Sequence, residues 1–327
     1  MEVRLDKCAG FCFGVKRAVD TVYEQLKTGK TIYTYGPIVH NEEVIRELAE
    51  RGVRVLADVE ALEAIPTADE RRSATDLHRE ESEEERSGET RGTGLHREES
   101  VERHPERGSG QPPVVIIRAH GVPRTVYGIL EEKGLECVDA TCPFVKRIHG
   151  IVEKESAAGK HIVVVGNPGH PEVEGILGWC RGDATVLETA EEAEKFVPPA
   201  GREICVVSQT TFNYNKFYYI VEIFEKKGYN VSVVNTVCSA TEERQRSARD
   251  LAREADVMIV IGGRHSSNTK KLYDICCEEC ADTYFIQTLD DLHLELPKSV
   301  GLVGITAGAS TPNKLIEEVQ NYVRINF

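Results

Sequence analysis

The chain has 327 residues, 40% of them hydrophobic, which is long enough for two or three domains with buried cores. Its formal net charge of −14 makes nucleic acid and anionic membrane surfaces poor partners. No apolar run approaches the roughly 18 residues that a membrane-spanning helix needs, so we expect no membrane partner.

The predicted elements begin with a helix. Apolar residues from Val15 to Leu26 keep a helical spacing, and residues 31–35 then predict a strand. Residues 66–112 interrupt this pattern, because they hold thirteen acidic residues, eight arginines and no aromatic residue, and the sequence LHREES occurs twice in them. Such a stretch cannot bury enough apolar area to fold, so we predict a disordered insertion there.

Strands and helices alternate along the rest of the chain. Apolar residues at helical spacing predict a helix at 145–152. Short apolar runs predict strands at 114–117, 162–165, 204–207, 257–261 and 300–303. Short strands that alternate with helices indicate parallel sheets covered by helices. Polar loops follow these strands, and ligands of such sheets bind beyond the carboxyl ends of the strands.

One pattern occurs three times, and it starts at Cys12, Cys142 and Cys238. Each cysteine is followed 24 residues later by a glycine, at positions 36, 166 and 262. Four residues beyond each glycine stands a side chain that can donate or accept a hydrogen bond, namely His40, His170 and Ser266. We therefore predict an α/β fold in which three units are related by a pseudo-threefold axis, as in a trefoil.

The repeat divides the chain into three predicted units. The first is 13–141, interrupted by the insertion 66–112, the second is 142–235, and the third combines 236–327 with residues 1–12. This arrangement can bring the three thiolates together at one central site. Three thiolates without a fourth suit an iron–sulfur cluster that keeps one iron open for substrate. Zinc is the alternative metal, although its structural sites draw cysteines from short C-x₂-C spacings.

Several segments resemble the 4-hydroxy-3-methylbut-2-enyl diphosphate reductase (LytB/IspH) family. They keep their order and are AGFCFGV at 9–15, GPIVHN at 36–41, RAHGV at 118–122, DATCP at 139–143, GHPEVEG at 169–175, SQTT at 208–211, SSN at 266–268 and TAGAS at 306–310. The resemblance covers the whole chain outside 66–112. The chain departs from the family pattern in that insertion and at Thr269, where a serine is common.

The resemblance implies one [4Fe–4S] cluster per chain on Cys12, Cys142 and Cys238, with the fourth iron open. It implies an oxidoreductase that removes the allylic hydroxyl of its diphosphate substrate and gives isopentenyl and dimethylallyl diphosphate, the last step of the methylerythritol phosphate route to isoprenoids. An electron donor such as ferredoxin or flavodoxin would be its partner. Glu172 would be the proton source, with Thr210 as a relay. The diphosphate would be held by His40, His120, His170, Ser266, Ser267, Asn268 and Ser310.

None of these diphosphate-binding positions is a lysine or an arginine, although Arg118 and Arg264 are sequence neighbours. We therefore expect imidazoles, hydroxyls, an amide and backbone N–H groups at helix starts to hold the diphosphate.

The remaining cysteines are not expected to react. The C-x-x-C spacing within Cys276, Cys277 and Cys280 suggests metal or redox chemistry, but the residues before it predict the exposed end of a helix, so we expect no function. The cysteine pattern begins by residue 8, which leaves no room for a signal peptide. Ten cysteines without such a signal indicate a reducing compartment, so we expect a cytoplasmic protein.

Two other functions stay open at this point. A dehydratase similar to quinolinate synthase also has three α/β units that each supply a cluster cysteine, and a redox or metal sensor could carry a cluster without turnover. The GHPEVEG and SSN loops favour the reductase over the dehydratase, and a sensor would not need this many phosphate-type donors. Turnover of the diphosphate with a chemical reductant distinguishes all three.

Overall fold

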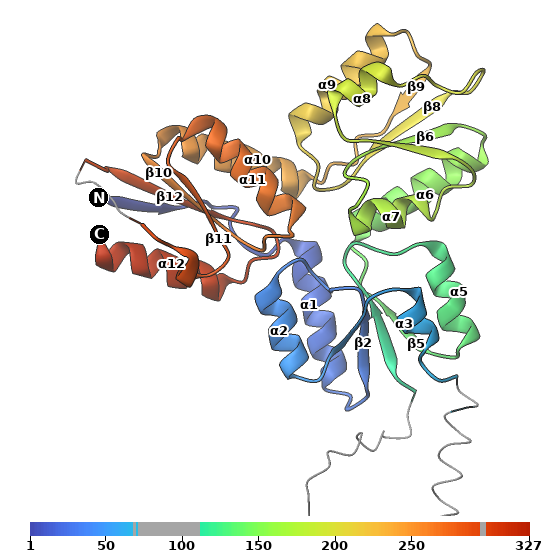
Figure 1. The fold of residues 1–327 in the computed structure, drawn as a ribbon, viewed down its shortest axis with the longest axis horizontal. Helices are drawn as coiled ribbons and strands as arrows, with labels where there is room; N and C mark the ends of the chain where they lie inside the picture. Colours follow the sequence, from blue (N-terminus) through green and yellow to red (C-terminus); the bar gives the residue numbers. More distant parts are fainter. Residues whose placement is uncertain (68–69, 71–111, 295–298) are drawn as a thin grey trace, which may run out of the picture.

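A computed structural model describes residues 1–67, 70, 112–294 and 299–327, so most of the predicted insertion lies outside the described residues. The described chain forms three parallel sheets of four strands each, in three lobes around a common centre (Figure 1). This confirms the predicted α/β fold class with three similar units. The unit boundaries at 141/142 and 235/236 stay a prediction.

The first sheet has the strand order β3-β2-β4-β5. Its strands are β2 (Ile32–Tyr35), β3 (Arg54–Leu56), β4 (Val114–Ile117) and β5 (Glu136–Asp139). The helices of this lobe are α1 (Phe13–Leu26), α2 (Glu42–Glu50), α3 (Val59–Glu63) and α5 (Arg124–Glu132). The central strands β2 and β4 are parallel and pair up to Tyr35 opposite Ile117, so the loops that follow them leave the sheet at the same edge.

The second sheet repeats this arrangement in the order β7-β6-β8-β9. Its strands are β6 (His161–Val165), β7 (Ala184–Leu187), β8 (Ile204–Ser208) and β9 (Val231–Val233). The helices are α6 (Pro143–Ala157), α7 (Pro171–Leu177), α8 (Ala190–Lys195) and α9 (Tyr214–Lys226). The central strands β6 and β8 are again parallel and pair up to Val165 opposite Ser208.

The third sheet combines the two ends of the chain in the order β1-β12-β10-β11. Its strands are β1 (Glu2–Leu5), β10 (Val257–Ile261), β11 (Thr283–Ile286) and β12 (Leu302–Ala307). The helices are α10 (Ser239–Glu254), α11 (Ser267–Glu279), α12 (Asn313–Asn326) and the short 3₁₀ helix η1 (Leu289–Asp291). Because β1 pairs with β12 from Glu2 opposite Leu302, the N-terminal segment lies in the same lobe as the C-terminus (Figure 1).

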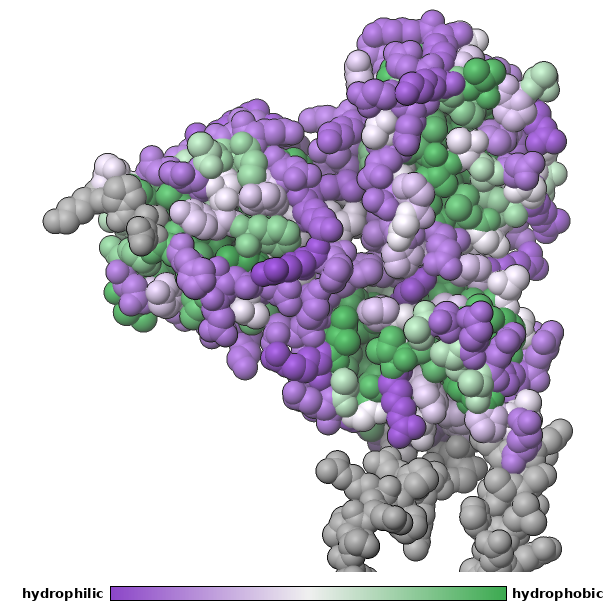
Figure 2. Space-filling model, viewed as in Figure 1, coloured by the Kyte–Doolittle hydropathy of each residue, from purple (hydrophilic) through white to green (hydrophobic). Residues whose placement is uncertain are grey.

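Helices cover both faces of each sheet, which explains the continuous apolar runs of the central strands. In β6, Val163 and Val165 pack in one core cluster with residues of α8 and α9. Ile162 and Val164 point to the other face, where they pack with residues of α6 and α7. Figure 2 shows hydrophilic residues over most of the visible face, with hydrophobic patches within each lobe. No helix in the described part of the chain is long and apolar enough to cross a membrane.

The glycine that follows each cysteine in the repeat ends a central strand and is closely packed. A Cβ atom at Gly36 would lie 2.4 Å from the Arg118 side chain, and one at Gly262 would lie 2.6 Å from the Thr269 hydroxyl. The nearest side-chain atom to a Cβ at Gly166 would be 2.9 Å away. The repeated glycine therefore lets the polar loop after each strand fold back against its neighbours.

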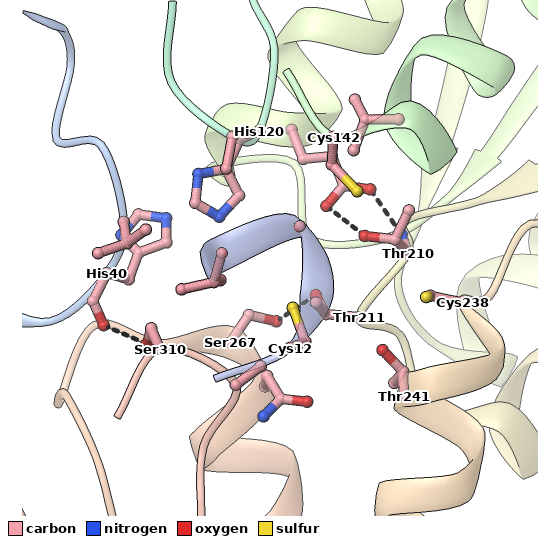
Figure 3. A pocket seen from close by; sticks show the side chains of 18 of the residues that line it. Cys12, His40, His120, Cys142, Thr210, Thr211, Cys238, Thr241, Ser267 and Ser310 are labelled. Atoms are coloured by element: carbon pink, nitrogen blue, oxygen red, sulfur yellow. Dashed lines mark hydrogen bonds between the residues drawn. The ribbon is translucent and has the colours of Figure 1, made fainter. Parts of the chain in front are cut away.

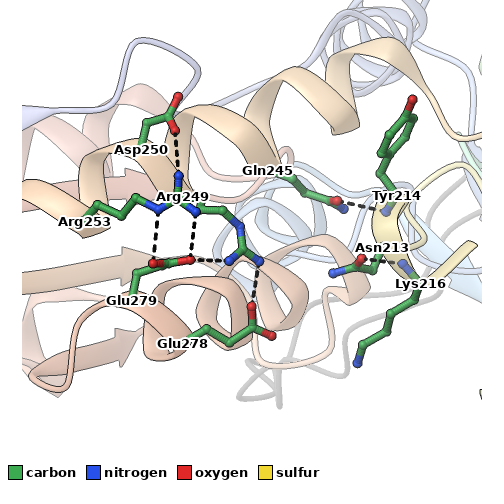
Figure 4. Close-up of polar contacts among 9 residues, drawn as sticks. All are labelled: Asn213, Tyr214, Lys216, Gln245, Arg249, Asp250, Arg253, Glu278 and Glu279. Atoms are coloured by element: carbon green, nitrogen blue, oxygen red, sulfur yellow. Dashed lines mark hydrogen bonds and ion pairs between the residues drawn. The ribbon is translucent and has the colours of Figure 1, made fainter. Parts of the chain in front are cut away.

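Polar contacts join helices around the third lobe (Figure 4). Arg249 and Arg253 of α10 form ion pairs with Glu279 of α11, so these two helices lie side by side. The Gln245 side chain of α10 accepts a hydrogen bond from the backbone N–H of Tyr214 at 3.1 Å. This contact ties α10 to the start of α9, which belongs to the second lobe, close to the loop that follows β8.

Candidate active site

One pocket opens where the three lobes meet, beyond the carboxyl ends of the central strands (Figure 3). The structure places all the site residues predicted from the sequence in its lining. They are Cys12, Cys142, Cys238, Glu172, Thr210, His40, His120, His170, Ser266, Ser267, Asn268 and Ser310. The sequence predicted this convergence, and their individual roles stay predictions.

Each of the three cysteines stands at the start of a helix. Cys12, Cys142 and Cys238 are the N-cap residues of α1, α6 and α10, and none of their side chains caps its own helix. Burial raises the pKa of the Cys142 and Cys238 thiols, whereas the backbone N–H groups of the first helical turns lower it. At Cys142 and Cys238 the helix N-termini therefore offset part of the cost that burial adds to forming the thiolate, the form that binds metal.

Two arginines hold the loops that precede two of the cysteines. Arg17 of α1 donates hydrogen bonds to the backbone carbonyls of residues 139–141, just before the cysteine of α6. Arg244 of α10 donates to the carbonyls of Ala307 and Gly10, both at 2.9 Å, and Gly10 lies two residues before the cysteine of α1. Each arginine belongs to a helix that begins at another cysteine, so the ligand loops are tied to one another.

Three histidines gather on the opposite side of the pocket. The ring centroids of His40 and His120 are 4.4 Å apart, and His170 lies 5.3 and 5.4 Å from them. Their ligand nitrogens all lie within 4.8 Å of one another, which is close enough to share one ion or one oxyanion. The backbone N–H of Glu172 donates to Nδ1 of His170 at 3.1 Å, so a neutral His170 ring carries its proton on Nε2.

The imidazoles are neutral in the free pocket at pH 7. Burial lowers the pKa of His40 to about 4 and that of His170 to about 3. Burial also lowers the pKa of His120 well below its usual value. The buried guanidinium of Arg118 lowers all three pKa values further by charge repulsion. Neutral imidazole offers one donor and one acceptor, so these rings can donate N–H groups to a ligand without being charged.

Hydroxyl and amide groups complete this side of the pocket. Ser266 is the N-cap of α11 and accepts a hydrogen bond from the backbone N–H of Thr269. The Ser310 hydroxyl donates to the backbone carbonyl of His40 at 2.9 Å and so joins the first and third lobes. The side-chain nitrogen of Asn268 is buried and has no protein partner among the described residues. An unpartnered buried donor that lines a pocket is a favourable site for an anionic ligand.

A buried carboxyl group lies between the histidines and the cysteines. Glu172 is 1% exposed, and its two carboxyl oxygens accept hydrogen bonds from the backbone N–H and the hydroxyl of Thr210, at 2.6 and 2.8 Å. Burial raises the pKa of Glu172 to about 7, although the two hydrogen bonds from Thr210 lower it. A carboxyl group with a pKa near 7 is suited to proton transfer at neutral pH.

The chain matches the family model described as LytB protein over residues 3–324. A 4-hydroxy-3-methylbut-2-enyl diphosphate reductase of Alkaliphilus oremlandii is 40% identical over 322 residues, which cover 98% of each chain. The enzyme of the same name from Clostridioides difficile is 37% identical over 324 residues, or 99% of each chain. This chain belongs to the LytB family.

Solved structures of LytB relatives have the same fold. The E-1-hydroxy-2-methyl-but-2-enyl-4-diphosphate reductase from Plasmodium falciparum has a TM-score of 0.79 and 25% identity, over 99% of this chain and 87% of that one. A second structure, of (E)-4-hydroxy-3-methyl-but-2-enyl diphosphate reductase, the terminal enzyme of the non-mevalonate pathway, has a TM-score of 0.60 and 36% identity, over 99% of this chain and all of that one.

Some residues of this LytB site were not found from the sequence. Arg244 lines the pocket, and Thr211 lies beside Thr210, but neither was predicted to act. Arg118 and Lys271 lie behind the pocket lining. In the sequence, only the position of Arg118 two residues before His120 indicated a role. Arg264, the other neighbouring arginine, is exposed and pairs with Asp291.

The C-x-x-C segment lies away from the pocket of this LytB protein. Cys276 and Cys280 are buried in a core cluster between α10 and β10, and Cys277 is exposed. The expectation of an exposed helix end was therefore wrong for Cys276 and Cys280, because α11 packs this face against α10. The Cys280 thiol contacts backbone carbonyls, as a packing residue does.

Proposed function

We propose that this chain is a 4-hydroxy-3-methylbut-2-enyl diphosphate reductase. It would remove the allylic hydroxyl of its substrate with two electrons and two protons, and release water together with isopentenyl or dimethylallyl diphosphate. The observation that carries this proposal is one pocket in which three cysteines at helix starts face a buried carboxyl group and a cluster of neutral anion donors. Family membership supports the same activity.

We further propose that Cys12, Cys142 and Cys238 hold one [4Fe–4S] cluster whose fourth iron has no protein ligand. All three thiols are free and line the same pocket. Among the described residues, the histidines form a group close enough to hold a single ion, whereas the three thiols do not. Wider spacing suits a cluster rather than one zinc ion. When bound, the cluster would supply electrons singly and a Lewis-acidic iron beside the substrate.

Glu172 and Thr210 would supply the proton. The backbone N–H of Thr210 always donates to one oxygen of Glu172, but the Thr210 hydroxyl can either donate to the other oxygen or accept from it. Both the ionised and the protonated carboxyl group are therefore satisfied by the same partner. This geometry supports a carboxyl group that gives up its proton to the leaving hydroxyl and regains one through the threonine hydroxyl.

A small electron carrier such as ferredoxin or flavodoxin is the proposed electron donor. We also propose a cytoplasmic location, which is supported by ten cysteines that are all free thiols.

Turnover tests the proposed reaction. We expect anaerobically purified protein to show the broad visible absorption of an iron–sulfur cluster, and to convert 4-hydroxy-3-methylbut-2-enyl diphosphate to both isomers with a chemical reductant. Two electrons should be consumed for each product molecule. A protein that carries the cluster and binds the diphosphate without turnover would instead be a sensor, and this would refute the proposed reaction.

A glycine between two of the cysteines gives a separate test of the cluster site. A Cβ atom at Gly14, in the first turn of α1, would lie 2.6 Å from the Cys142 sulfur. We expect Gly14→Ala to lose most of the iron and visible absorption after anaerobic reconstitution, because the added methyl group displaces this thiol. Gly150→Ala is the matched control, since Gly150 lies in α6 with no atom within 4 Å of its added Cβ. Equal iron content in both variants would remove Cys142 from the ligand set.

A further inference from the structure

We propose that the positive charge that holds the substrate's diphosphate lies one side chain behind the pocket, on Lys271 and Arg118. Neither residue is part of the pocket lining, so both act as positioning residues through the side chains in front of them. The proposal rests on the proposed function for the identity of the anion. These two cations explain how an acidic chain whose binding residues are uncharged can hold a group with two or three negative charges.

Lys271 lies behind the serine side of the pocket. Its ammonium group donates a hydrogen bond to the Ser267 hydroxyl at 3.1 Å and lies 5.2 Å from the centre of the Phe212 ring. No carboxylate of the described residues lies within ion-pair distance of it, although Glu188, Asp274 and Glu172 attract it at longer range. The Lys271 side chain is partly buried, and this burial lowers its pKa. A partly buried cation with no carboxylate in direct contact is stabilised when an anion binds nearby.

The hydrogen bonds around Ser267 direct a hydroxyl proton into the pocket. The Ser267 oxygen accepts from Lys271, and from the Gln209 amide at 3.4 Å. Ser267 and Thr211 are also 3.3 Å apart, oxygen to oxygen, and Thr211 accepts from Gln209 as well. The Ser267 and Thr211 hydroxyls carry one proton each, and only one of these two protons can lie in the hydrogen bond between them. The other proton is available to a ligand, because both hydroxyls line the pocket. Their oxygens already accept hydrogen bonds from the Lys271 ammonium group or the Gln209 amide.

Arg118 lies behind the histidine side. It is 6% exposed, and its Nε donates to the backbone carbonyl of Gly121 at 3.2 Å. Its nearest carboxylate is that of Glu174, which is 3.7 Å away and whose side chain is 64% exposed, so the pair is weak. Its hydrogen bond to Gly121, the residue after His120, and its close packing against Gly36, four residues before His40, hold the guanidinium beside the histidine loops, where its charge acts on all three imidazoles. Its charge therefore favours an anion bound to neutral imidazole N–H groups, and is screened little because the guanidinium is buried.

Adjacent lysines provide the test for Lys271. Lys270 and Lys271 are neighbours on α11, but Lys270 is exposed, so Lys270→Met and Lys271→Met change the net charge equally. We expect Lys271→Met to weaken the binding of inorganic pyrophosphate to the cluster-loaded protein at least tenfold, measured by calorimetry. Lys270→Met should stay within twofold of the native affinity. Lys271→Arg should recover binding to within threefold, because it keeps the charge.

A parallel pair of variants tests Arg118. Arg118→Met should also weaken pyrophosphate binding at least tenfold, whereas Arg124→Met, which removes an exposed arginine at the start of α5, should not. The Met variants of Lys271 and Arg118 should keep the native visible absorption and should raise the substrate KM more than they lower kcat. Should Arg118→Met fail to fold, Arg118→Lys, which keeps the charge, should bind pyrophosphate within threefold of the native protein, and a tenfold weaker Arg118→Lys would overturn the role of the Arg118 charge.

The proposal is overturned if Lys271→Met binds pyrophosphate within twofold of the native protein, or if Lys271→Arg is as weak as Lys271→Met. The result is separable from the proposed reaction. If the native protein does not reduce the diphosphate but its pyrophosphate affinity depends on Lys271, the anion site stands and the reductase assignment falls. If Lys271→Met turns over normally and binds pyrophosphate as the native protein does, the reductase assignment is supported and the role of Lys271 is refuted.

Discussion

Replacing Cys12, Cys142 or Cys238 with serine is expected to abolish both the visible absorption of the protein and its reductase activity. Each thiol stands at the N-terminus of a different helix and lines the same pocket, so each would supply its own ligand to the cluster. Serine is nearly the same size but offers a harder oxygen ligand that binds iron–sulfur clusters poorly. Iron content, absorption and turnover of the anaerobically reconstituted variants measure the effect.

The cysteines of α11 provide the controls for this experiment. Cys277→Ser changes an exposed thiol, and Cys280→Ser changes a buried one outside the pocket lining. Both variants should keep the cluster and the activity, although the buried position can lose some stability because a hydroxyl replaces a packed thiol. Loss of the cluster in Cys280→Ser at unchanged folding would mean that the ligand assignment is wrong.

Replacing Glu172 with glutamine is expected to slow turnover at least a hundredfold while the cluster and substrate binding are retained. A positioned acid typically contributes on the order of 10²–10⁴-fold. Glutamine fits the site, because its carbonyl can accept from the Thr210 N–H while its amide donates to the Thr210 hydroxyl. The variant therefore removes the transferable proton and leaves the hydrogen bonds. Single-turnover measurements with prereduced protein separate this chemical step from substrate binding.

The pH dependence of turnover gives an internal check on Glu172. Burial raises the pKa of Glu172 to about 7, so the carboxyl group loses its proton as the pH rises through about 7. Turnover of the native protein should therefore decrease above this pH, and the residual turnover of Glu172→Gln should not follow the same decrease. Near-native turnover in the glutamine variant would remove Glu172 from the mechanism.

The sequence alone predicted the α/β class and the convergence of the site residues. Three cysteines in a common register could be assigned to one centre because repeated units place equivalent loops at equivalent positions. The central strands were predicted from their apolar runs, since helices bury both of their faces. The outer strands were missed, because strands such as β3 (Arg54–Leu56) and β9 (Val231–Val233) are three residues long and partly exposed, so they carry little apolar signal.

Tertiary structure decided the electrostatics of the site. The pKa of Glu172 depends on how completely the folded chain buries it, and no local pattern encodes that burial. Lys271 and Arg118 look like ordinary surface cations in the sequence, and only their packing behind Ser267 and the imidazoles gives them a role. Residue types and their spacing determine which side chains can meet, whereas dehydration and distance to other charges arise only when separate segments pack together.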